Sequence, residues 1–189
     1  MTGPMEIPVI DLGGLNGGGE ERSRTLAELH DACKDWGFFW VENHGVDAPL
    51  MDEVKRFVYG HYEEHLEAKF YASALEFLRA GAHWVPVGPT KGGRLFVNIG
   101  DQIEVLSAGA YRSVLHRVAA GDQGRRLSVA TFYNPGTDAV VAPAPRRDQD
   151  AGAAAYPGPY RFGDYLDYYQ GTKFGDKDAR FQAVKKLLG

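Results

Sequence analysis

His116 and the pair Arg126/Ser128 lie ten residues apart, and their side chains could bind a metal and a carboxylate. Apolar residues beside His116 and the turn signal at Gly121–Gly124 predict a strand, a tight turn and a second strand. Residues two apart on a strand share a face, so Arg126 and Ser128 are expected to point the same way. Because arginine stays charged and donates two parallel hydrogen bonds, this pair suits a carboxylate. A histidine on the neighbouring strand could hold a metal against such a ligand.

A metal site of two histidines and one carboxylate needs further ligands near His116. The chain has six histidines, and none is followed two positions later by aspartate. His61 and His65 are four apart on a predicted helix, each followed by a glutamate (Glu63, Glu67), so this face could grip a metal. We favour a solvated helix face there, because the segment is rich in charge. The sequence therefore predicts one strand ligand without its partners.

The positions of the expected elements follow from apolar periodicity and from glycine and proline breaks. Gly37 is expected to end the first helix, and Asn43–Gly45 to form a turn in which Gly45 adopts a conformation that favours glycine. Segment 72–78 has no β-branched residue, so continuation of the second helix is an alternative to a strand there. Strands are expected at 7–12, 38–42, 75–78, 84–87, 95–105 and on both sides of the 121–124 turn, and helices at 23–34, 49–70, 160–169 and 179–188.

Size and composition limit the class of protein. The chain has 189 residues, of which 44% are hydrophobic and 12% aromatic, so we expect one globular domain or slightly more. A net charge of −4 gives no reason to expect nucleic acid or an anionic membrane as a partner. Cys33 is the single cysteine, so no intrachain disulfide can form. No secretion signal and no membrane-spanning run is visible, and we expect a cytoplasmic protein.

Longer strings extend the pattern around His116. MEIPVIDL stands at 5–12, WGFFWVENHGV at 36–46, NIGDQIEV at 98–105 and TFYNPG at 131–136, and a basic tail carries Lys173, Lys177 and Arg180. Together with the Arg126/Ser128 pair, these strings resemble the plant 1-aminocyclopropane-1-carboxylate (ACC) oxidase family of non-haem Fe(II) dioxygenases. The resemblance covers nearly all of 1–73 and 74–189. What the family has between these two regions is absent from this chain.

The resemblance implies an α+β fold, an incomplete double-stranded β-helix of the jelly-roll or cupin type flanked by N- and C-terminal helices. Residues 1–73 correspond to the N-terminal helical region. Residues 74–189 correspond to the C-terminal half of the β-helix and the C-terminal helices. The absent block would carry the first half of the barrel and its His-x-Asp iron ligands. Strands that have lost their neighbours expose open edges, so self-association through those edges is expected.

The resemblance also implies the oxidation of ACC to ethylene with O₂, Fe(II) and ascorbate, with bicarbonate or CO₂ as activator. His116 would be the surviving iron ligand. Arg126 and Ser128 would bind ascorbate or bicarbonate, and Lys173 and Arg180 would support catalysis from the tail.

Two positions near His116 depart from the family pattern. Arg112 stands where the family usually has lysine, and Leu115 stands where it more often has methionine or another residue. Arginine keeps the charge of lysine but changes its geometry. Because Leu115 differs from the family residue, the family pattern does not determine how side chains pack around His116.

Two rival functions stand beside ethylene formation. One is a non-catalytic truncated isoform or remnant that acts through protein contacts, which the ligand count favours over catalysis. The other is a different 2-oxoglutarate-dependent oxygenase, which the string at 132–136 and the basic tail disfavour. Iron affinity distinguishes the enzyme from the remnant, because the two differ in whether three ligands exist.

Overall fold

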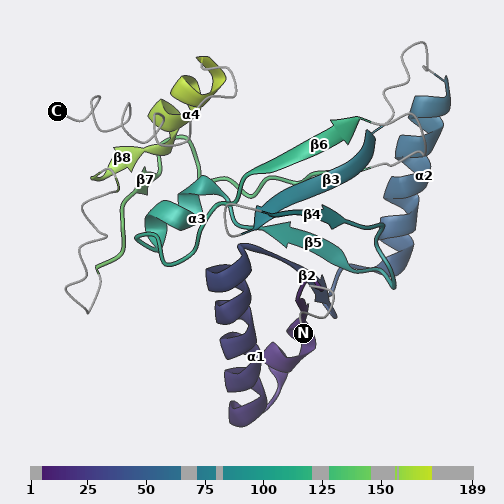
Figure 1. Ribbon diagram of the computed structural model, residues 1–189, viewed down its shortest axis with the longest axis horizontal. Helices are drawn as coiled ribbons and strands as arrows, with labels where there is room; N and C mark the ends of the chain where they lie inside the picture. Colours follow the sequence, from purple (N-terminus) through teal and green to yellow (C-terminus); the bar gives the residue numbers. More distant parts are fainter. Residues whose placement is uncertain are drawn as a thin grey trace. The chain divides into compact units, whose positions relative to one another are not determined.

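The computed structural model describes residues 6–64, 72–79, 83–120, 128–145, 156 and 158–171 (Figure 1). Contacts divide the chain into two units. The first contains Met1–Asn98 and Val114–Ser128, and the second contains Ile99–Ser113 and Val129–Gly189. The boundary predicted at 73/74 separates two regions of the family sequence rather than two contact units, and it stays a prediction.

The first unit begins with a three-stranded sheet in the order β1-β2-β5. β1 (Val9–Asp11) runs parallel to β2 (Phe38–Glu42), and β2 runs antiparallel to β5 (Leu95–Asn98). Helix α1 (Gly19–Asp31) connects the two parallel strands. After α1 the chain makes a π-helical turn. The helical segment ends at Gly37, whose φ of 75° lies in the left-handed region. The predicted strand at 38–42 and the predicted helix end at Gly37 are therefore confirmed.

A second sheet in the first unit has the order β4-β3-β6 and is antiparallel throughout. It consists of β3 (Ala72–Arg79), β4 (His83–Val87) and β6 (His116–Ala120). The helical alternative for 72–78 is wrong, although this segment has no β-branched residue. Phe77 shows why, because it pairs with Val85 on one side and with His116 on the other. Pairing and burial between two neighbours outweigh intrinsic propensity.

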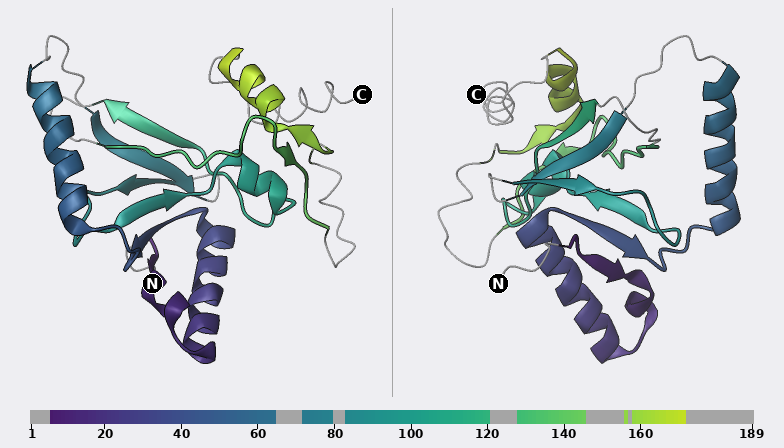
Figure 2. Two further views of the ribbon diagram at one scale, coloured as in Figure 1. Left: turned by 180° about the vertical axis from the view of Figure 1, so that it is seen from behind. Right: turned by 45° about the vertical axis from the view of Figure 1, so that its right-hand side comes forward.

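One aromatic cluster joins the two sheets. Phe38 of the first sheet and Phe77 of the second are 0% and 2% exposed, and their ring centroids lie 4.9 Å apart. Phe96 of β5 lies 5.1 Å from Phe77 and completes the group. Val85 and Val87 of β4 are buried against these rings. The strands of the two sheets lie next to each other in both views of Figure 2, as this shared core requires.

Helix α2 (Ala48–Glu64) follows the predicted start at 49, and the predicted extension through 65–70 lies outside the described residues. The apolar stripe of this helix is uncovered in the described part of the chain. Leu50 is 52% exposed, Val54 40% and Phe57 76%. An amphipathic helix normally buries such a stripe.

The second unit contains α3 (Asp101–Leu106), β7 (Val140–Val141), β8 (Tyr160–Arg161) and α4 (Phe162–Gly171). Its core consists of Val105, Val141, Tyr160, Phe162 and Tyr165. Two predictions are corrected here. The strand predicted at 95–105 ends at Asn98, and the helix predicted at 160–169 starts at Phe162 after a short strand. The helix predicted at 179–188 lies outside the described residues.

The early end of the 95–105 strand has a local cause. Gly100 has the extended backbone of a helix N-cap, with φ −96° and ψ 171°, and Asp101 and Glu104 stand in the first turn of α3. Glycine is accepted at an N-cap, and acidic side chains stabilise the positive end of a helix. These signals outweigh the apolar residues that suggested a longer strand.

The hairpin predicted around residues 121–124 is only half present in what the structure describes. Its first strand is β6, but residues 128–131 form no strand. Phe132 is 80% exposed and Tyr133 is fully exposed. The turn Gly121–Gly124 and Arg126 lie outside the described residues.

Among the described residues no helix is long and apolar enough to cross a membrane.

Candidate functional site

His116 is the first residue of β6, at the edge of the second sheet. Its side chain is exposed, and the imidazole stacks on the ring of Phe77 with centroids 4.9 Å apart and planes inclined by 22°. The Nδ1 atom lies 3.3 Å from the carbonyl oxygen of Val114. The face of the sheet that bears His116 also bears Leu75 and Val118, which pair with each other. The histidine therefore stands on an apolar surface.

Glu76, the acidic residue next to His116 in the strand ladder, forms an ion pair with Arg117. Glu76 pairs with Arg117, one residue along each strand, so it lies on the opposite face of the sheet from His116. Its Oε2 atom lies 2.7 Å from Nε of Arg117, whose guanidinium also stacks 4.0 Å above Trp84. On the His116 face the charged neighbour is Arg79, whose guanidinium lies 3.7 Å above the ring of Trp36.

The other predicted site residues are not brought to His116 by any described contact. Ser128 is exposed and stands in a segment without regular structure. His61 is exposed near the end of α2. Arg126, His65, Lys173 and Arg180 lie outside the described residues. Within the described ranges no group of three His, Cys, Asp or Glu side chains is placed to hold a metal ion.

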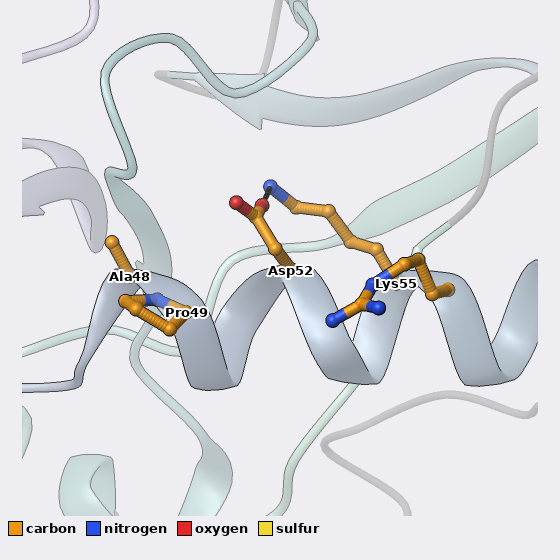
Figure 3. A pocket seen from close by; sticks show the side chains of 5 residues that line it. Ala48, Pro49, Asp52 and Lys55 are labelled. Carbon is orange, nitrogen blue, oxygen red and sulfur yellow. Dashed lines mark hydrogen bonds and ion pairs between the residues drawn. The ribbon is translucent and has the colours of Figure 1, made fainter.

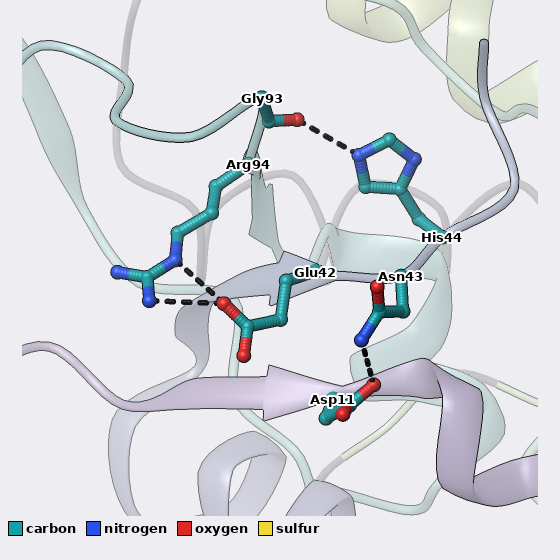
Figure 4. Close-up of polar contacts among 6 residues, drawn as sticks. All are labelled: Asp11, Glu42, Asn43, His44, Gly93 and Arg94. Carbon is teal, nitrogen blue, oxygen red and sulfur yellow. Dashed lines mark hydrogen bonds and ion pairs between the residues drawn. The ribbon is translucent and has the colours of Figure 1, made fainter. Parts of the chain in front are cut away.

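A polar cluster of the first unit surrounds the predicted Asn43–Gly45 turn (Figure 4). Asn43 has φ 52° and Gly45 has φ 77°, so the predicted special conformation of Gly45 is confirmed. His44 links this turn to the next one. Its Nε2 lies 2.9 Å from the carbonyl oxygen of Gly93, and its Nδ1 accepts a hydrogen bond of 3.1 Å from the Val46 N–H.

Two further pairs fix the edges of the same cluster. Arg94 donates to Oε2 of Glu42 from both Nε and a terminal nitrogen, each at 2.9 Å. The Asn43 amide donates to Asp11 at 2.7 Å. This bond, followed by the N–H of Gly13, holds the pKa of Asp11 below its ordinary value of 3.8. The predicted turn at Asn43–Gly45 is therefore held by side-chain hydrogen bonds to neighbouring segments.

Sequence reasoning missed a second polar group, in the second unit. Glu104 is 6% exposed, and its carboxylate accepts from the Ser113 N–H at 2.6 Å and from the Tyr156 hydroxyl at 3.1 Å. The Tyr160 hydroxyl donates to Gln102 at 2.7 Å. Burial, and then the charge of Asp101, raise the pKa of Tyr160 above its ordinary value of 10.0. The polar residues of the string DQIE at 101–104 are the sequence signal for this group. The sequence predicts a strand over this string, so the group was not predicted.

A shallow hollow on α2 has the wrong construction for a binding site. It is lined by Ala48, Pro49, Asp52, Lys55 and Arg56, all from one helix (Figure 3). Lys55 pairs with Asp52 at 3.0 Å on an exposed surface. Ligand sites are concave and gather groups from several elements, which this hollow does not.

Similarity to known proteins adds to this geometry. Residues 7–112 match the family described as non-haem dioxygenase in morphine synthesis N-terminal. The chain is 32% identical to 1-aminocyclopropane-1-carboxylate oxidase 1 of Arabidopsis thaliana, over 97% of this chain and 96% of that protein. The chain belongs to the ACC oxidase family of non-haem dioxygenases. A further relative, 1-aminocyclopropane-1-carboxylate oxidase 1 of Oryza sativa, is 26% identical over 96% of this chain and 95% of the relative.

The alignment with the Arabidopsis oxidase also measures what the chain lacks. The alignment has 306 positions, whereas the whole chain has 189 residues. At least 117 of the aligned positions are therefore gaps in this chain. The relative is nevertheless matched over almost its full length. This chain is therefore an ACC oxidase relative with a large amount of family sequence missing between its matched parts.

Solved structures confirm the fold class. A crystal structure of JOX2 in complex with 2OG, Fe and JA is similar with a TM-score of 0.75 and 18% identity, over 95% of this chain and 89% of that one. The structure of a dioxygenase for auxin oxidation in rice is similar with a TM-score of 0.64 and 19% identity, over 93% of this chain and 99% of that one. These proteins have the double-stranded β-helix fold, of which this chain has an incomplete version flanked by helices.

ACC oxidases depend on Fe(II), so the donor groups of this chain can be compared with what that ion requires. A non-haem Fe(II) site takes two histidines and one carboxylate. His116 stands on apolar side chains, the acid beside it is paired with Arg117, and the charge on its own face is that of Arg79. The described residues do not fit an Fe(II) site.

Proposed function

We propose that this chain is a non-catalytic member of the ACC oxidase family. The observation that carries the proposal is the environment of His116, an imidazole stacked on Phe77 with no second ligand among the described residues. One imidazole does not hold Fe(II) against water, because the facial triad supplies three protein groups. The absence of any His-x-Asp string from the sequence supports the same conclusion.

The reaction that this chain would otherwise perform is the oxidation of ACC to ethylene with O₂ and ascorbate, activated by bicarbonate. In such an enzyme His116 would bind iron, Arg126 and Ser128 would hold ascorbate or bicarbonate, and Lys173 and Arg180 would act from the tail. We place the chain in the cytoplasm, without a nucleic-acid or membrane partner. Its remaining function would then depend on protein contacts.

Anaerobic titration calorimetry with Fe(II) tests the proposal. We expect weak binding that is the same for the unchanged protein and for His116→Ala. His83→Ala is the matched control, because His83 is another exposed strand histidine. Tight one-to-one binding that His116→Ala abolishes and His83→Ala retains would refute the proposal.

Ethylene formation provides an independent test. The purified chain is incubated with ACC, Fe(II), ascorbate and bicarbonate, and ethylene is measured in the headspace. We expect none above a protein-free control, because most of the rate comes from positioning and preorganised charge. Robust turnover would show that other ligands replace the missing pair, with His61, His65 and their glutamates the first to mutate. A parallel incubation with 2-oxoglutarate, followed by succinate, tests the other oxygenase chemistry.

A further inference from the structure

The outer side of β6 carries backbone groups that no described strand pairs with. β6 is a terminal strand of the sheet order β4-β3-β6. The Leu78 N–H donates to the Leu115 carbonyl at 2.8 Å, so these two residues form a hydrogen-bonded pair of the ladder. Such pairs alternate along antiparallel strands, and therefore His116, Val118 and Ala120 direct their N–H and C=O groups away from β3. Within the described part of the chain, this side of β6 is an unpaired edge (Figure 1).

The other edges of the described sheets are less suited to pairing. β4, at the far side of the same sheet, contains Pro86, which has no N–H to donate. In the first sheet the terminal strands β1 and β5 have three and four residues. β6 has five residues and no proline. Among the edge strands of these two sheets, β6 is therefore the one that is neither shorter than five residues nor interrupted by proline.

We propose that two copies of this chain associate by antiparallel pairing of β6 with β6, about a twofold axis at Val118. In this register Val118 stands opposite Val118 of the second copy, and His116 stands opposite Ala120. Each such pair exchanges two hydrogen bonds, so all three outward-facing residues of each strand are used. The strand is complementary to itself in this arrangement.

The charges of β6 favour a second copy as the occupant. Arg117 is the residue of β6 with a permanent charge, and it is neutralised within its own sheet by Glu76 at 2.7 Å. The twofold register places Arg117 opposite Ala119 of the second copy, so no like charges meet. Val118 is 65% exposed and would be covered by its own equivalent. β-branched pairs of this kind stabilise neighbouring strands.

Sedimentation equilibrium over a range of protein concentrations tests the proposal. A contact this small gives weak association, and we expect a dissociation constant between about 10 µM and 1 mM. Val118→Lys and Val118→Glu each place like charges across the axis, and each is expected to weaken association about tenfold. Val140→Lys is the matched control, because Val140 is 66% exposed on strand β7, which belongs to a different sheet from β6. It should leave association unchanged.

The decisive sample is a mixture of the Val118→Lys and Val118→Glu proteins. Opposite charges then meet across the axis, so association should return to at least the level of the unchanged protein. Far-UV circular dichroism confirms that each variant is folded. A chain that stays monomeric at every concentration, equal effects of Val118→Lys and Val140→Lys, or a mixture that fails to associate would each overturn the proposal. The measurement is made with a chelator present, so its outcome is independent of whether the chain binds iron.

Discussion

Truncation of Phe77 to alanine removes the side chain that joins the two sheets of the first unit. Phe77 is 2% exposed, and its ring contacts Phe38 at 4.9 Å and Phe96 at 5.1 Å between centroids. Large-to-small substitutions of buried phenylalanine cost about 3–5 kcal/mol, and the near-complete burial of Phe77 places it in the upper part of that range. The stability of a domain is only about 5–15 kcal/mol, so this one change removes a large fraction of it.

Urea denaturation followed by tryptophan fluorescence measures the loss. Trp36 and Trp40 are suited as reporters, because their rings lie 5.6 Å from Phe38 and 5.1 Å from Phe96. We expect the unfolding midpoint of Phe77→Ala to fall by about 1 M urea or more. Phe57→Ala is the matched control, since the same atoms are removed from a ring that is 76% exposed, and its effect should be below about 0.5 kcal/mol.

Two results would contradict the reasoning. Equal effects of Phe77→Ala and Phe57→Ala would mean that the two sheets do not share a core. A smooth fluorescence change without a transition in the unchanged protein would mean that the incomplete barrel has no cooperative packing at all. A sharp transition would show that the two sheets unfold as one cooperative unit.

Other properties of the fold give further tests. Burial raises the pKa of Cys33 above its ordinary value of 9.0, so the thiol should react with iodoacetamide many times more slowly in the folded chain than in urea, measured by mass spectrometry. The pKa of Tyr160 is also raised, so the folded state retains a proton that the unfolded state releases, and stability should fall as pH rises above about 10. Tyr160→Phe should lessen this fall, measured by denaturation at several pH values. Gly45→Ala should cost about 1 kcal/mol because of the φ of 77°, whereas Gly88→Ala, at an uncrowded glycine without positive φ, should be nearly neutral in the same assay.

Local signals in the sequence were sufficient where neighbours in the chain decide the structure. Gly37 ends the first helix and Gly45 adopts a conformation that favours glycine, as predicted, and both have a positive φ. The strand 38–42 was predicted with the correct bounds. In each case the deciding interaction lies within a few residues of the signal.

The predictions that failed depended on distant partners. Residues 128–131 have the alternation of a strand, but no described strand lies beside them, so Ser128 and Val129 are exposed. The strand predicted at 75–78 is confirmed and only its helical alternative is wrong, because β4 and β6 pair with this segment on both sides although it has no β-branched residue. The site followed the same rule. His116 was placed correctly on a strand, whereas the loss of its metal partners depends on sequence that the chain does not contain.

The parallel pairing of β1 with β2 also has a consequence for synthesis on the ribosome. The unit formed by β1, α1 and β2 is complete in sequence once residue 42 has emerged. The ring of Phe38, which is 0% exposed in the finished fold, then lacks the cover of Phe77 and Phe96 until those residues have been translated. Throughout that interval the nascent chain presents an aromatic surface to its surroundings. Chaperone capture should therefore peak while residues between 42 and 96 are being added, and slower translation of that stretch should lengthen it.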